Sequence, residues 1–159
     1  MRKPKIYLET SVISHLKQDN APKETKVTLA LWEELKKGLY DIYISSVVLN
    51  EVKANKEPKR TLLLEHLKEI EYKLMAIDDE TEAYAKKMIE EGILTVNHYE
   101  DCLHIACAVV NDCDMILSWN IKHIVRVKTV NGVRLINAMF GYHGIDIYLP
   151  SMIINKELN

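Results

Sequence analysis

The sequence predicts an α/β fold with a mostly parallel central sheet flanked by helices. Short β-prone runs alternate along the chain with helix-like segments, which is the order that a parallel sheet with crossover helices requires. The predicted strand at 115–118 and most of the predicted helix at 99–111 are apolar on every side, as elements covered on both faces are. With 159 residues, 48% of them hydrophobic, the chain is expected to form a single domain over residues 1–159.

The first half of the chain is expected to contain three strands and four helices. A strand over 6–9 precedes a short helix over 10–16. The next helix, over 23–37, is predicted by Val27, Leu31 and Leu35 at four-residue spacing, and Gly38 should end it. The remaining elements are a strand over 41–45, a helix over 47–55 capped by Ser46, a helix from Pro58 to about Tyr72, and a weak strand over 74–77.

The second half repeats this alternation. Asp78 or Asp79 should cap a helix over 80–91 that Gly92 ends. Asn97 and Glu100 resemble a capping box at the start of the apolar helix over 99–111. A strand over 115–118, a helix over 130–139 and a last strand over 145–149 complete the prediction.

Composition excludes several classes of protein. The formal net charge of −2 argues against a globally basic nucleic-acid-binding domain. Three cysteines argue against a disulfide framework, and they are expected to lie in the core. Neither the cysteines nor His98, His123 and His143 show the spacing of a zinc site. No apolar run approaches the ~20 residues of a membrane span, and no signal peptide is recognisable, so a cytoplasmic protein is expected.

Four polar residues stand at comparable points of the predicted units. Glu9 ends the first strand, and Glu51 lies on the helix after the second. Asp101 lies in the first turn of the apolar helix, and Asn120 follows the strand at 115–118. Because the carboxyl ends of parallel strands meet at one edge, these side chains should gather there. Carboxylates so placed repel each other without a cation, and oxygen ligands suit Mg²⁺ or Mn²⁺.

Each of the four residues also has an ordinary structural explanation. Glu9 could be a surface acid at a strand end, and Glu51 one charge on the solvent face of a helix. Asp101 could complement the helix dipole, and Asn120 could be a turn residue. Their convergence at one edge, rather than any single residue, therefore indicates a site.

The segments that carry these residues resemble the PIN domain, a metal-dependent ribonuclease fold found in VapC-like toxins of bacterial and archaeal toxin–antitoxin pairs. In chain order, the matching pieces are IYLETSVI at 6–13, ISS at 44–46 leading to Glu51 and Val52, DCLHIA at 101–106, and DMILSWN at 114–120. Singly each piece is a weak signal, whereas their order and spacing together are fairly specific.

The resemblance implies a three-layer PIN-like fold and an endoribonuclease that hydrolyses RNA phosphodiester bonds with Mg²⁺ or Mn²⁺. Glu9, Glu51 and Asp101 would then be the metal ligands, and Ser118 and Asn120 would complete the catalytic site. An antitoxin protein and a second copy of the chain are the partners that the resemblance implies. The basic residues that directly follow Asn120 are expected to contact RNA phosphates; they are Lys122, His123 and Arg126.

Two positions depart from the family's pattern. Glu9 stands where the family usually has Asp, and Asn120 where it often has another Asp. The extra methylene of Glu9 moves its carboxylate by ~1 Å, and displacements of that size can lower a rate about 100-fold. The alternative is therefore a catalytically weak or inactive PIN-fold module that acts by binding RNA or protein. His104 is expected to be a buried, hydrogen-bonded histidine or to orient a carboxylate, and Trp119 to pack at the rim or to stack on a base.

Overall fold

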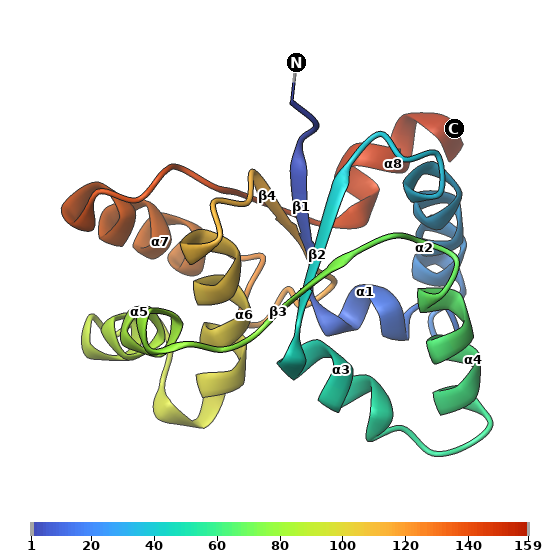
Figure 1. Ribbon diagram of the computed structural model, residues 1–159, viewed down its shortest axis with the longest axis horizontal. Coiled ribbons are helices and arrows are strands. Elements are labelled where there is room, and N and C mark those ends of the chain that lie inside the picture. The colour runs from blue at the N-terminus through green and yellow to red at the C-terminus, as the bar shows by residue number, and fades with distance from the viewer. Residues whose placement is uncertain (1, 159) are drawn as a thin grey trace.

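The computed structural model describes residues 2–158, with side chains to residue 154. Within this part of the chain, a parallel five-stranded sheet occupies the centre (Figure 1). Its strands are β1 (Lys5–Leu8), β2 (Asp41–Ser45), β3 (Lys73–Met75), β4 (Met115–Leu117) and β5 (Asp146–Tyr148), arranged in the order β3-β2-β1-β4-β5. Every neighbouring pair is parallel, which confirms the predicted fold class.

Helices cover both faces of the sheet and form the outer two of three layers (Figure 1). One face carries α5 (Asp79–Glu90), α6 (Tyr99–Val110) and α7 (Val127–Phe140). The other carries α1 (Thr10–Ser14), α2 (Pro22–Leu35), α4 (Lys59–Leu67) and α8 (Pro150–Leu158). α3 (Ser46–Lys53) continues directly from β2 at the end where the strands stop.

The core lies where the central strand meets the apolar helix. Ile6, Tyr7 and Leu8 of β1 are fully buried, because β1 has strands on both sides and helices on both faces. In α6, all residues between positions 102 and 109 are buried, as the all-round apolar pattern predicted. The three cysteines are buried and unpaired, as expected. No helix in the described residues is long and apolar enough to cross a bilayer.

Some predicted helix ends are confirmed by their local hydrogen bonds. Asp78 caps α5, since its carboxylate accepts a hydrogen bond of 2.9 Å from the backbone N–H of Thr81. Gly92 ends α5 with a φ of +72°, a conformation in which a side chain would be strained. The N–H of Ile93 then bonds to the carbonyl of Met88 at 3.0 Å and closes the last turn.

Other boundaries were predicted wrongly. Ser45, rather than Ser46, is the N-cap of α3. α4 ends at Leu67 instead of near Tyr72, because the chain turns so that Ile70 packs into the core before β3 begins. α7 begins three residues earlier than expected, at Val127, and α8 was not predicted.

The predicted capping box at the start of α6 is also wrong. Asn97 lies inside a short 3₁₀ turn, η1 (Val96–His98), and His98 is the N-cap residue of α6 without a side-chain hydrogen bond to the helix. The extra turn changes which side chains flank the start of α6. It places His98 beside Asp101, one helical turn away.

Candidate functional site

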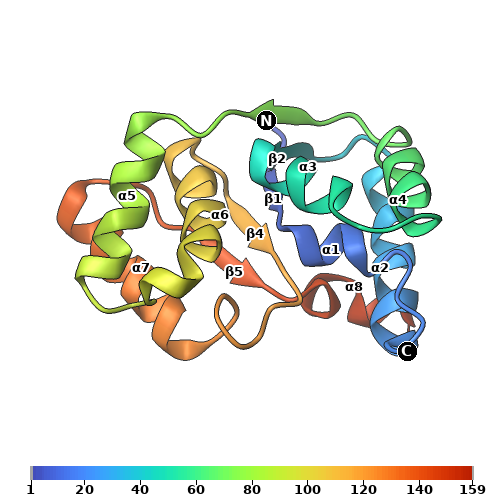
Figure 2. The same ribbon diagram turned by 90° about the horizontal axis from the view of Figure 1, so that it is seen from below.

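The candidate site lies at the edge of the sheet where the strands end, beside the switch point between β1 and β4. The chain leaves β1 for β2 on one side, whereas β4 pairs with β1 on the other. Ligands in open α/β sheets bind in the crevice outside the strands at such a point. Figure 2 views this end of the molecule, with α1, α3 and α6 arranged around it.

Glu9 lies at the centre of this edge and is almost fully buried. Its Oε1 accepts hydrogen bonds from the hydroxyl groups of Ser11 at 2.5 Å and Ser118 at 2.6 Å. Its Oε2 accepts one of 3.1 Å from the backbone N–H of Ser11, so Glu9 is also the N-cap of α1. Four lone-pair sites are available on a carboxylate, and these donors take three of them.

Glu51 projects from α3 toward the same edge and is oriented by two donors. Thr10 Oγ1 donates to Glu51 Oε1 at 2.6 Å, and His104 Nε2 lies 2.7 Å from the same oxygen. The other ring nitrogen of His104 lies 2.7 Å from the hydroxyl of Tyr7, which in turn contacts Ser45 Oγ at 2.8 Å. This buried network fixes the imidazole, and the imidazole fixes the carboxylate.

Asp101 lies in the first turn of α6. Its Oδ1 accepts a hydrogen bond of 3.3 Å from the side-chain amide of Asn120, and its Oδ2 lies 4.0 Å from His98 Nδ1. Asn120 is itself held by the loop after β4, because its Oδ1 accepts the backbone N–H of His123 at 3.0 Å. The carboxylate of Asp101 therefore has one oxygen toward Asn120 and the other toward His98.

The protonation equilibria show that negative charge is concentrated here. Burial and the nearby charge of Glu9 raise the pKa of Asp101. A hydrogen bond with Glu51 and the charge of Glu51 raise the pKa of Glu100. Partial burial opposes ionisation of Glu51, but the hydrogen bonds from His104 and Thr10 outweigh it, so its pKa is lowered. A bound cation would relieve the repulsion that raises the first two pKa values.

An open cleft of about 440 Å³ gives solvent access to Glu51, Glu100 and Asp101. It is lined by Glu51, Val96, Asn97, His98, Tyr99, Glu100 and Asp101. Its lining therefore contains three carboxylates and one imidazole, and His98 Nδ1 lies 4.0 Å from Asp101 Oδ2. Such a donor set suits a divalent cation better than an anion.

Comparison with known proteins identifies the family. A family model described as PIN domain matches residues 6–126, well over half of the chain. The chain belongs to the PIN domain family. No curated protein matches the sequence of this PIN domain.

Solved structures resemble this PIN domain in fold. One is a chain of VapBC2 from Rickettsia felis bound to a DNA fragment from the promoter, with a TM-score of 0.56 and 18% identity over 91% of this chain and 98% of that one. Another is a chain of DNA-bound VapBC from Salmonella typhimurium, with a TM-score of 0.54 and 14% identity over 92% of this chain and 98% of that one. At these identities the likeness establishes the shared fold.

The predicted site residues of this PIN domain lie at one edge of the sheet and are paired with one another there. Glu9 and Ser118 are in contact, Asp101 contacts Asn120, and Glu51 lies in the same cleft as Asp101. Their catalytic and metal-binding roles stay predictions. His104 contacts Glu51, as an orienting role would require. Trp119 packs against its surroundings, and its ring N–H donates to Thr28 Oγ1 at 2.9 Å.

The predicted RNA-contacting residues lie in the loop after β4, with different surroundings. Lys122 is exposed to solvent. Arg126 donates hydrogen bonds to Thr129 Oγ1 at 3.0 Å and to the carbonyl of Ile93 at 3.1 Å, so it ties the loop to the segment before η1. The ring of His123 stacks on that of His98. Contact with RNA stays a prediction for all three.

Sequence reasoning missed several residues of the site. Thr10, Ser11 and Glu100 orient or flank the carboxylates, and each stands within two residues of a predicted acid, which was the available signal. His98 was set aside because its spacing from His123 matches no zinc motif. No linear spacing signals this group, yet the fold brings ligand atoms of both imidazoles within 4.8 Å of Asp101.

Proposed function

We propose that this PIN domain, as a single domain over residues 1–159, is a divalent-metal-dependent endoribonuclease and the toxin of a VapC-type pair. The observation that carries the proposal is the placement of Glu9, Glu51 and Asp101 at the carboxyl edge of a parallel sheet, where Glu51 and Asp101 line one cleft and the charge of Glu9 helps to raise the pKa of Asp101. Carboxylates that raise one another's pKa favour a cation, and an exposed acidic cleft without one would repel RNA phosphates.

The donor set fits Mg²⁺ or Mn²⁺. Asp101, Glu51 and Glu9 would be the protein ligands, and Asn120 adds a neutral polar group. When bound, such an ion lowers the pKa of a water molecule and stabilises charge on a phosphate. Of the two departures from the family pattern, Asn120 removes one formal charge, whereas Glu9 keeps its charge on a longer side chain, so three carboxylates remain in place.

The surrounding residues hold these carboxylates in position. Thr10 and His104 fix Glu51 through Oε1 and leave Oε2 free of both donors. Ser118 holds Glu9, and Asn120 holds Asp101. Preorganised ligands of this kind lose little conformational entropy when substrate binds, and they keep reacting groups within the tolerance of about 1 Å that catalysis requires.

The proposed partners follow from the structures that this PIN domain resembles. Both are VapBC assemblies bound to DNA, which supports an antitoxin protein as a partner of this chain. An RNA substrate, a homodimer and a cytoplasmic location belong to the same proposal. Lys122, His123 and Arg126 adjoin the site and are the proposed phosphate contacts.

Cleavage of a labelled RNA pool tests the proposal. The purified protein should cleave RNA in Mn²⁺ or Mg²⁺ and stop in EDTA. The Asp101→Asn variant should lose at least about 100-fold in rate, because it removes a charged ligand. Asp146→Asn is the matched control, since Asp146 is exposed at the opposite end of the sheet. Equal cleavage by wild type, Asp101→Asn and the EDTA sample would overturn the proposal.

The hydrogen bonds that Glu9 already accepts favour a second function. Its three hydrogen bonds from Ser11 and Ser118 compete with a metal ion, and Asn120 lacks the charge of an aspartate. The chain would then be a weak or inactive PIN module that acts by binding RNA or protein. In this case the double substitution Glu9→Asp and Asn120→Asp should raise both Mn²⁺ affinity and cleavage at least tenfold, on the order expected for restored ligands. A wild type that already cleaves as fast as the double variant excludes it.

A further inference from the structure

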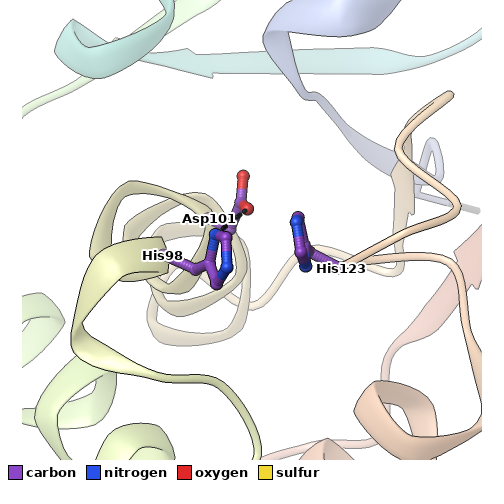
Figure 3. A group of neighbouring side chains, drawn as sticks. All are labelled: His98, Asp101 and His123. Carbon is purple, nitrogen blue, oxygen red and sulfur yellow. Dashed lines mark ion pairs between the residues drawn. The ribbon is translucent and has the colours of Figure 1, made fainter.

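A group of two imidazoles and one carboxylate lies at the rim of the acidic cleft. His98, Asp101 and His123 offer ligand atoms that all lie within 4.8 Å of one another. Figure 3 shows His98 and Asp101 side by side at the start of α6, with the ring of His123 facing them from the loop after β4. The two rings are stacked with their centroids 3.7 Å apart.

We propose that His98, Asp101 and His123 form a binding site for a borderline-soft divalent transition metal such as Zn²⁺. This inference does not depend on nuclease activity, since it concerns the affinity of three side chains for an ion. Mg²⁺ prefers oxygen ligands, whereas two imidazoles and one carboxylate suit Zn²⁺ and its neighbours in the transition series.

The distances allow the three groups to converge. Zn–N and Zn–O bonds of about 2.0–2.1 Å at tetrahedral angles put neighbouring ligand atoms roughly 3.4 Å apart. His98 Nδ1 and Asp101 Oδ2 are already 4.0 Å apart. The remaining closure is ~1 Å or somewhat more, and all three side chains are partly exposed, so rotation of the side chains can supply it.

The backbone on both sides of the group is held in place. His123 follows a turn in which Asn120 Oδ1 accepts its N–H at 3.0 Å. His98 ends η1, where its own N–H bonds to the carbonyl of Thr95 at 2.9 Å. Arg126 joins the two segments by donating to Ile93, just before η1, at 3.1 Å. The two imidazoles are therefore presented by fixed backbone, which lowers the entropy lost on binding.

The charges around the three ligands favour a cation, although the N-terminus of α6 lies nearby. The N-terminus of α6 carries partial positive charge, which disfavours a metal ion. Glu100 and Asp101 in its first turn outweigh this, and the charge of Glu51 is close enough to raise the pKa of Glu100. Three protein ligands leave one tetrahedral position open for water or a phosphate oxygen. Asp101 belongs to both donor sets, since its other oxygen faces Asn120.

Calorimetric titration of the tag-free full chain with Zn²⁺ tests the site. One equivalent should bind at micromolar protein, and millimolar Mg²⁺ should not displace it. His98→Ala and His123→Ala should each weaken binding at least about tenfold. His143→Ala, a matched change at an exposed histidine, should bind as wild type does. Glu51→Gln removes a nearby charge but no ligand, so it should weaken binding less than either histidine variant does.

Co²⁺ provides a second readout that does not depend on affinity alone. The wild-type complex should show visible d–d absorption of a site with nitrogen ligands, and both histidine variants should lose it while their circular dichroism stays native. No Zn²⁺ binding by the wild type, or equal binding by His98→Ala and His123→Ala, would overturn the assignment. Loss of binding in Glu51→Gln alone would place the ion in the carboxylate set instead and would also overturn it.

Discussion

His104 Nε2 lies 2.7 Å from Glu51 Oε1, and this contact joins the buried centre of the sheet to the candidate site. The imidazole is 1% exposed, and its other nitrogen is held by the hydroxyl of Tyr7. A carboxylate on α3 is thus oriented by a histidine on α6, 53 positions further along the chain. The packing of these two helices therefore decides where Glu51 points.

Replacing this histidine should impair catalysis more than folding. We expect His104→Phe to lower RNA cleavage about 10- to 100-fold, the range seen when a group that orients a metal ligand is removed. His104→Gln, which can still donate to Glu51, should recover part of the rate. Single-turnover cleavage of both variants, with thermal unfolding as the control for folding, measures the difference. Equal cleavage rates for His104→Phe, His104→Gln and the wild type would contradict a positioning role for His104.

Ser118 offers a test of how Glu9 is held. Ser118→Ala removes the 2.6 Å hydrogen bond to Glu9 and the acceptor for the backbone N–H of Asn120 at 2.9 Å. We expect about 1 kcal/mol lower unfolding free energy, and a cleavage rate that falls about tenfold. Urea unfolding and cleavage assays measure the two effects. Ser151→Ala on α8 is the control, and a faster Ser118→Ala enzyme would instead indicate that the hydroxyl restrains Glu9 from binding metal.

The decrease of the unfolding free energy at acid pH should depend partly on Asp114. Bidentate hydrogen bonds from Arg2, at 2.7 and 2.9 Å, and a third from the N–H of Lys5 lower the pKa of this carboxyl. A folded-state pKa below the unfolded value of about 3.9 contributes stability that is present above that pH and is lost as the pH falls through the folded pKa. Asp114→Asn should therefore lower the unfolding free energy at pH 7. The loss should be only about 1 kcal/mol, because solvent screens a partly exposed ion pair.

Urea denaturation over a pH series measures this difference. The gap between wild type and Asp114→Asn should narrow as the pH falls below about 4. Asp112→Asn, at an exposed neighbouring position, should leave the curve close to that of wild type. A gap that stays constant down to acid pH would mean that the hydrogen bonds to Asp114 do not depend on its charge.

A buried polar pair between α5 and α7 should contribute measurably to stability. Tyr84 donates a hydrogen bond of 2.6 Å to Asn137 Oδ1, and both residues are buried. Tyr84→Phe leaves that oxygen without its donor, so we expect a loss of about 1–3 kcal/mol in unfolding free energy. Tyr142→Phe removes a hydroxyl that bonds to Glu80 at an exposed position, and it should change stability by less than about 0.5 kcal/mol. Similar losses of unfolding free energy in Tyr84→Phe and Tyr142→Phe would contradict the inference that the buried hydrogen bond contributes more than the exposed one.

Much of the fold could be predicted because it is local. The apolar runs that form β1 and β4, the spacing that forms α2, and the cap at Asp78 depend on a few consecutive residues, and each prediction is confirmed. Errors occurred where the tertiary structure competes with local preference. Asn97 has a capping pattern with Glu100, yet the chain forms η1 there and His98 begins α6.

The order of strands and acids along the sequence determined the α/β class and the gathering of Glu9, Glu51, Asp101 and Asn120 at one sheet edge, because parallel strands end on the same side. Only the tertiary structure decided how those groups are held. Glu9 bonds to Ser118, 109 positions away, and His98 stacks on His123. Periodicity reports which face of an element is buried, whereas the choice of partner depends on how separate elements pack, and no local pattern records that packing.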